Sequence, residues 1–200
     1  MKSPNHPTRA RTRLGRAAAP LLFALCLCLL PPASASAQGR REHLTPEEIE
    51  LVRDNQVLDA RTGVFIKAAE RRLLAVTNPA EAAKNAAKDK EKWGELKGTR
   101  AQLFYDISKI LDEAVVNVDD VATHEPDSPL LRKSLYMLAQ AAGRILPELA
   151  RLRDGVTEEA EADQLDRALE TAKDIAEAAR ERDVNAGDMK AKAKAAKKDN

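Results

Sequence analysis

The stretch Thr99–Thr123, TRAQLFYDISKILDEAVVNVDDVAT, decides the fold class of this chain. Its apolar residues recur at steps of three or four, at Leu103, Ile107, Ile110, Ala114, Val118 and Val121. This spacing places their side chains on one stripe of an α-helix. Because a single amphipathic helix is not stable in water, the stretch predicts that other helices of the chain pack against this stripe.

The segment before this stretch predicts one long helix over about 46–77. Thr45-Pro46-Glu47-Glu48 has the pattern of a capping box with proline at the first helical position. Asn78-Pro79 predicts the end of the helix, because the residue before proline is disfavoured in helical conformation. The following connection, 78–98, is rich in alanine and lysine and has few residues to bury, so we expect it to be exposed.

Two further helices are expected after the central one, which itself should span about 99–123. Ser128-Pro129 predicts a helix start at 129, and the helix should run to about 153. Its leucine-rich stripe has the heptad spacing of a coiled coil. The last helix should span about 158–182. These observations predict an all-α antiparallel four-helix bundle, up-down-up-down, over 45–182; an open helical array or a dimer that shares helices is the alternative.

The N-terminal segment, residues 1–37, has the pattern of a cleaved signal peptide. Five basic residues without an acidic one precede an apolar run over 17–30, and small residues follow up to Ala37, where we expect cleavage. A membrane anchor is the alternative, but the apolar run is shorter than the roughly 20 residues that span a bilayer. The pattern predicts an exported protein, periplasmic or secreted.

Cleavage after Ala37 would change both the cysteine content and the charge of the chain. Cys26 and Cys28 are its two cysteines, so the mature chain would contain no disulfide and no thiolate metal site. Removing five of the 33 basic residues leaves 28 against 32 acidic ones, a net charge of about −4. This acidic balance argues against bulk nucleic-acid binding. We expect a polar leader over 38–44, one domain, and a disordered lysine-rich tail over 183–200.

No motif of catalysis or of cofactor binding occurs in the predicted mature chain. Patterns of the di-iron bundle, the zinc protease, the attached haem, the serine nucleophile and the phosphate loop are all missing. We therefore expect no cofactor, no metal and no enzymatic activity. The leading hypothesis is an exported helical protein that interacts with other proteins or with envelope material, and its alternative is a bundle that binds a small ligand or a cation.

Two groups of polar residues are the candidates for ligand or partner contact. Asn55 and Thr62 fall among the core positions of the first helix, and Asn117 lies on the second. Such residues fix the register of a helical seam or line a small pocket. A surrounding pocket would favour the ligand hypothesis, whereas an exposed apolar groove would favour the partner hypothesis.

The second group is an acidic ladder on the central helix. Asp106, Glu113 and Asp120 are seven residues apart, a spacing that places them on one face. The ladder is either a site for a divalent cation or a basic peptide, or a solvated face. His124 lies four residues after Asp120, so the two side chains could hold a metal weakly or serve only at the helix C-terminus.

Overall fold

The computed structural model describes residues 41–182, and all regular secondary structure within that range is helical. All but Arg41 belong to one unit that begins at Glu42. The elements are α2 (Pro46–Asp54), α3 (Leu58–Thr77), α4 (Pro79–Trp93), α5 (Arg100–His124), α6 (Pro129–Leu152), the 3-10 turn η1 (Arg153–Gly155) and α7 (Glu159–Glu181). None of these described helices has the length and apolar character needed to cross a membrane.

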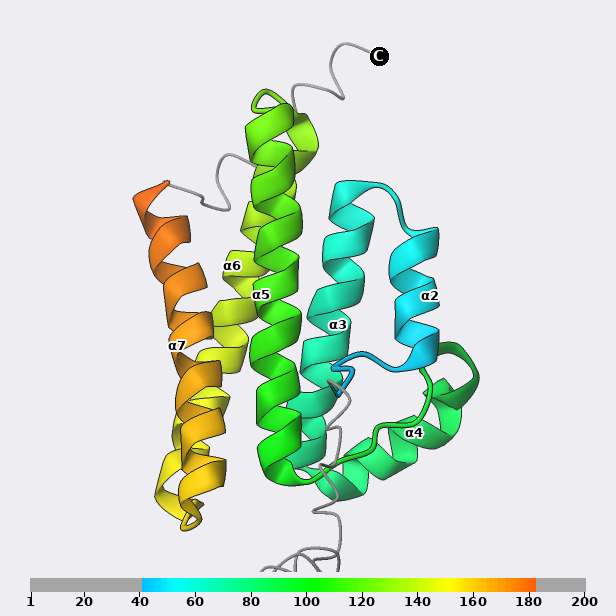
Figure 1. Cartoon of the computed structure of the whole chain (residues 1–200), viewed down its shortest axis with the longest axis vertical. Helices are drawn as coiled ribbons and strands as arrows, with labels where there is room; N and C mark the ends of the chain where they lie inside the picture. Colours follow the sequence, from blue (N-terminus) through cyan, green and yellow to red (C-terminus); the bar gives the residue numbers. More distant parts are fainter. Residues whose placement is uncertain (1–40, 183–200) are drawn as a thin grey trace, which may run out of the picture. The chain divides into compact units, whose positions relative to one another are not determined.

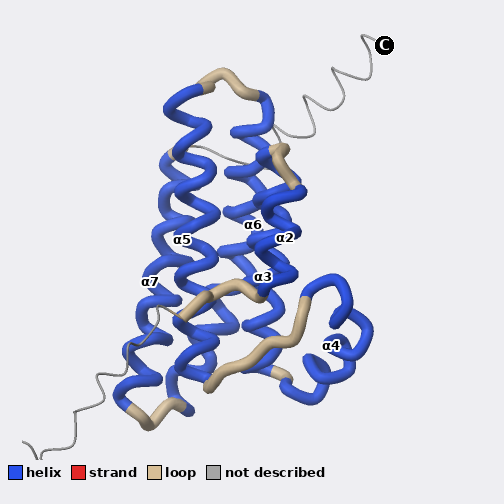
Figure 2. Tube along the Cα trace, turned by 45° about the vertical axis from the view of Figure 1, so that its right-hand side comes forward, coloured by secondary structure: helices blue, strands red, loops and turns tan. Residues whose placement is uncertain are grey.

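Four long helices surround the core. In space they follow the order α3, α5, α7 and α6, each packed against the next, and α6 packs back against α3 (Figure 1). The consecutive helices α5 and α6 lie at opposite corners of this arrangement and touch only lightly. The two shorter helices, α2 and α4, pack on the outer side of α3 (Figure 2).

The core lies between the four long helices. Its large side chains are fully buried, and each contributes about 1.5–3 kcal/mol through removal from water. They come from all four helices: Phe65, Phe104, Ile107, Ile110, Leu111, Ile145, Leu149 and Leu165. The stripe that we identified on 99–123 is therefore the face that α5 buries.

The expected continuous helix over 46–77 is wrong. It is divided at Asn55, and α2 folds back beside α3 (Figure 1). The reason lies in the contacts of Glu48, whose carboxylate bonds to Arg72. In a straight helix these two residues would stand about 36 Å apart. The apolar stripe continued across the break, so the spacing alone did not reveal it.

The described range holds six α-helices, because the connection 78–98 also contains one. Helix α4 has no buried residue, in agreement with the expected exposure. Asn78 ends α3 and caps α4, since its side chain accepts a hydrogen bond from the amide of Glu81 at 3.1 Å. The capping box at Thr45 and Glu48 is confirmed. The remaining helices begin and end within one residue of the expected bounds.

Three of the predicted segments lie partly or wholly outside the described residues. They are the signal peptide over 1–37, the first part of the leader over 38–44, and the lysine-rich tail over 183–200.

Candidate functional site

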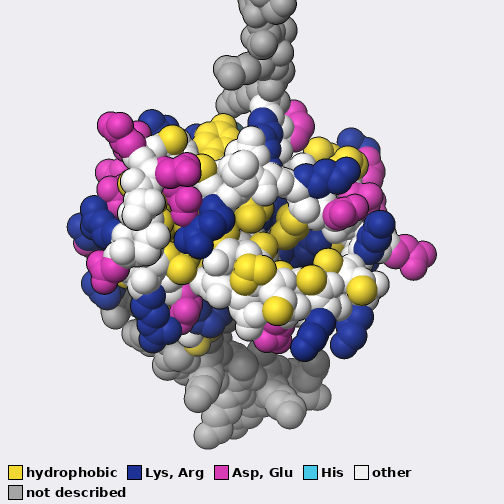
Figure 3. Space-filling model, turned by 90° about the horizontal axis from the view of Figure 1, so that it is seen from below, with side chains coloured by type: hydrophobic (Ala, Val, Ile, Leu, Met, Phe, Trp, Pro, Cys, Tyr) yellow, Lys and Arg dark blue, Asp and Glu magenta, His cyan; other side chains and the backbone are white. Residues whose placement is uncertain are grey.

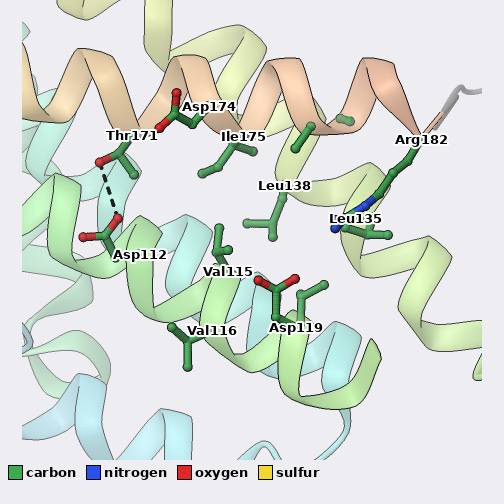
Figure 4. Close-up of a pocket in the computed structure, with 13 residues that line it drawn as sticks. Asp112, Val115, Val116, Asp119, Leu135, Leu138, Thr171, Asp174, Ile175 and Arg182 are labelled. Atoms are coloured by element: carbon green, nitrogen blue, oxygen red, sulfur yellow. Dashed lines mark hydrogen bonds between the residues drawn. The ribbon is translucent and has the colours of Figure 1, made fainter. Parts of the chain in front are cut away.

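A groove opens where the C-terminal halves of α5 and α7 lie across α6 (Figure 4). Its volume is about 390 Å³, and it is open to solvent along one side. The residues that line it are Asp112, Val115, Val116, Val118, Asp119, Leu135, Leu138, Thr171, Asp174, Ile175, Ala178, Ala179 and Arg182.

The lining of the groove is mainly apolar. Leu138 of α6 and Ile175 of α7 are buried and also belong to the core. Val116 stands at the rim with 64% of its surface exposed, one of two large hydrophobic side chains that are strongly exposed among residues 41–182. An apolar surface that continues from the core to solvent in this way is typical of a binding site.

Carboxylates stand on both walls of this groove. Asp112 is already engaged, since it accepts a hydrogen bond from Thr171 at 3.4 Å and lies 3.4 Å from the amine of Lys109. Asp119 on α5 and Asp174 on α7 are exposed, and neither forms an ion pair with another residue in 41–182. The groove therefore combines an apolar floor with two carboxylates that lack an ion-pair partner, and Arg182 is the cation in its lining.

The groove extends beyond the end of α7. A second hollow of about 370 Å³ lies beside the α5–α6 connection, and Leu135 and Arg182 line both hollows. The guanidinium of Arg182 thus stands where the two spaces meet. Together they form an elongated surface, which suits an extended or helical segment.

A larger hollow of about 540 Å³ lies between α3 and α4, on the face that Figure 3 shows. Leu74 and Leu96 are its only large aliphatic lining residues, and the α4 side is mostly alanine. Its charged residues are partly engaged elsewhere, because Glu70 pairs with Arg144 at 2.7 Å and Arg71 pairs with Glu48. A larger share of its lining is polar than in the groove.

A second group of charges is buried where α2, α3 and α5 meet. The Glu48 carboxylate is fully buried and receives hydrogen bonds from both Arg71 and Arg72. The Nε atom of Arg72 lies 3.6 Å from a carboxylate oxygen of Asp106, which is also buried. We call these four residues the buried charge cluster.

The buried charge cluster also binds three backbone carbonyl groups from distant segments. Arg72 donates to the carbonyl of His43 at 2.6 Å. Arg71 donates to the carbonyls of Trp93 at 2.9 Å and Gly94 at 2.7 Å, and its guanidinium lies 5.6 Å from the Trp93 ring centroid. The cluster thus fastens the end of the leader and the end of α4 to α3. Its charges are used internally, and this points to a structural role.

The acidic ladder is divided among three different surroundings. Asp106 belongs to the buried charge cluster, while the Glu113 carboxylate lies 2.7 Å from the ring nitrogen Nε2 of His43. Asp120 is exposed and lies 3.3 Å from His124. The structure therefore does not bring Asp106, Glu113 and Asp120 together around one ligand. Within residues 41–182, no group of three or more His, Cys, Asp or Glu side chains is placed to hold a metal ion.

The three polar residues Asn55, Thr62 and Asn117 are also separated in their contacts. Asn55 ends α2, and its amide donates to the carbonyl of Leu51 at 2.7 Å. The buried hydroxyl of Thr62 donates to the carbonyl of Leu58 at 2.8 Å. Asn117 donates to the carbonyl of Glu113 at 2.8 Å and accepts from Arg61 at 3.1 Å. Each residue serves its own helix, and only Asn117 has a side-chain partner on another one.

Sequence reasoning missed both Arg72 and the groove. Arg72 does lie on the buried stripe of its helix, four residues after Ala68 and four before Val76, so a charged residue at a core position was the available signal. The groove has no comparable signal, because its lining comes from three helices whose spatial order the sequence does not give.

Comparison with known proteins finds no matching family model, no matching curated protein and no matching solved structure.

Proposed function

We propose that this chain is an exported, non-enzymatic helical protein that binds another protein through the groove between α5, α6 and α7. The observation that carries the proposal is the exposed apolar groove with the unpaired carboxylates of Asp119 and Asp174 on its walls. Buried charges in the rest of the described structure have partners, and a soluble protein gains nothing in stability from leaving an apolar groove exposed. Binding of a partner protein would cover this apolar surface and pair its carboxylates.

The sequence supports the export part of the proposal. Residues 1–37 have the pattern of a signal peptide cleaved after Ala37, and the chain that remains has no cysteine. We place the mature protein in the periplasm or outside the cell. We further propose that α3, α5, α6 and α7 form an up-down-up-down four-helix bundle with coiled-coil-like seams, to which α2 and α4 are added.

Site-specific photo-crosslinking in the host tests the protein-binding role. A photoreactive amino acid at Val116, on the rim of the groove, should join the chain to a discrete partner protein. The matched control is Val57, the other strongly exposed large hydrophobic residue, which does not line the groove. A partner captured equally from both positions, or from neither, contradicts the proposal.

A small ligand in the same groove is the second candidate. The volume of about 390 Å³ falls within the range of ligand pockets, roughly 300–1,000 Å³. Native mass spectrometry of protein isolated from the host envelope separates the two candidates. An added mass of a few hundred daltons would favour the ligand, whereas a second polypeptide would favour the partner.

A further inference from the structure

We infer that the partner segment bound in the groove is an amphipathic helix of another protein that carries lysine or arginine residues beside its apolar face. This inference rests on the protein-binding function proposed above and adds the chemistry of the partner. The spacing of the lining residues supports the helix, and the charge of the walls supports its basic character.

The lining residues on both walls recur with helical spacing. On α5 they run from Asp112 to Asp119, seven residues or about 10 Å along the axis. On α7 they run from Thr171 to Arg182 at alternating steps of three and one. Each wall therefore presents one face of a helix over two turns or more, and α6 forms the floor. A further helix packs into such a trough with its own residues at steps of three and four.

Three of the four charged residues that line the groove are acidic, and Arg182 at its end is the exception, so the walls favour a cationic partner. A helix seated on Leu135 and Leu138 would cover Asp119 on one wall and Asp174 on the other (Figure 4). Covering an unpaired carboxylate costs desolvation free energy unless a cation meets it. A helix with basic residues beside its apolar face supplies that cation, whereas a neutral or acidic helix does not. The same charges repel an anionic lipid surface.

A synthetic peptide tests this chemistry directly. The probe is a helix of about 18 residues, roughly 27 Å long, with leucines on one face and lysines seven residues apart along its border. The control peptide has glutamate in place of each lysine. Binding is measured by fluorescence anisotropy with the protein that begins after Ala37. The lysine peptide should bind, and its affinity should fall as the salt concentration rises. The affinity of the glutamate peptide should be at least about tenfold lower.

Two double variants locate the binding on the groove. Asp119→Asn with Asp174→Asn should weaken binding of the lysine peptide roughly three- to tenfold and reduce its salt dependence. Asp120→Asn with Glu170→Gln changes the net charge equally at exposed positions of α5 and α7 outside the groove, and should leave affinity nearly unchanged. Equal losses from the two pairs would mean unspecific attraction and would overturn the inference.

The remaining outcomes separate this inference from the proposed function. If Val116 crosslinks a partner but neither peptide binds, the groove receives a protein of different chemistry, so the inference fails and the proposed function stands. If the lysine peptide binds but no partner is crosslinked, the groove chemistry is supported and the proposed function fails. If the peptide binds only after truncation at Arg182, the chain's own residues 183–200 compete for the groove, and a partner from another protein is overturned as the occupant.

Discussion

Acidic residues occur in two opposite situations in this molecule. In the buried charge cluster, Glu48 is fully buried and held by Arg71 and Arg72. In the groove, Asp119 and Asp174 are exposed beside apolar residues and have no cationic partner within 41–182. The first arrangement fixes distant segments to one another. The second leaves exposed carboxylates and apolar side chains in the groove available to a binding partner.

Charges that hold the fold differ in burial from charges that are available for binding. Buried ions are costly to remove from water and tolerate little change in their partners. Exposed carboxylates cost little and can be altered with small effects on folding. Substitutions in the buried charge cluster should therefore change stability strongly, and substitutions of the groove carboxylates should change binding while stability stays nearly constant.

The largest expected effect is that of Glu48→Gln. It removes the negative charge between Arg71 and Arg72, which would remain buried without that partner. Breaking a buried ion pair by removing one member costs about 3–5 kcal/mol. Urea unfolding measures the loss, with Glu50→Gln as the control, because Glu50 is exposed and pairs only with Arg53 at the surface. Equal stability of the two variants would show that the cluster is not a structural junction.

Core truncation should distinguish the floor of the groove from the closed core. Leu149 is completely buried, and Leu138 is nearly so but lines the groove. Leucine-to-alanine changes cost about 2–5 kcal/mol, and the cost depends on how well the site collapses. We expect Leu149→Ala near the upper end and Leu138→Ala nearer the lower end, as measured by urea unfolding. The reverse order would mean that the groove is closed in solution.

The helical class and most element bounds could be predicted from the sequence, because they depend on local patterns. The stripe of 99–123 lies on one helix face, and the cap at Thr45 and the helix end at Asn78 depend on residues within a few positions of each other. The break at Asn55 could not be found in this way. It depends on Glu48 meeting Arg71 and Arg72, which are more than 20 positions away.

The candidate residues were less predictable for a related reason. Asp106, Glu113 and Asp120 do lie along one helix, but each meets a different partner: Arg72, His43 or the adjacent His124. Spacing along a helix gives the direction of a side chain and not the residue opposite it. Asp119 and Asp174 follow the same principle, since α5 and α7 become the walls of one groove only through their packing on α6.

A smaller effect is expected at Gly94, where the end of α4 meets the buried charge cluster. Its φ of 69° and ψ of 178° are unfavourable for any residue with a side chain. An added Cβ would also come within 2.8 Å of the Thr45 hydroxyl. Gly94→Ala should cost about 1–3 kcal/mol in urea unfolding. Gly155→Ala is the control, because a Cβ there meets no atom within 4 Å, and an equal loss would exclude a special role for this junction.

The smallest expected effect concerns an ion pair at the surface, between Asp59 of α3 and Lys133 of α6. The hydrogen bond from Lys133, with its positive charge, lowers the pKa of Asp59 below the usual 3.8. A carboxyl group with a lowered pKa in the folded state stabilises the fold above its unfolded pKa, near 3.9, and loses this contribution as the pH falls through the folded value. Asp59→Asn should therefore lower stability at pH 7 by less than about 1 kcal/mol, the usual limit for an exposed pair. Urea midpoints of the variant and the parent protein should converge as the pH falls below the lowered pKa of Asp59. A constant difference would assign the loss to the Asp59 hydrogen bond with the amide of Ala60 instead.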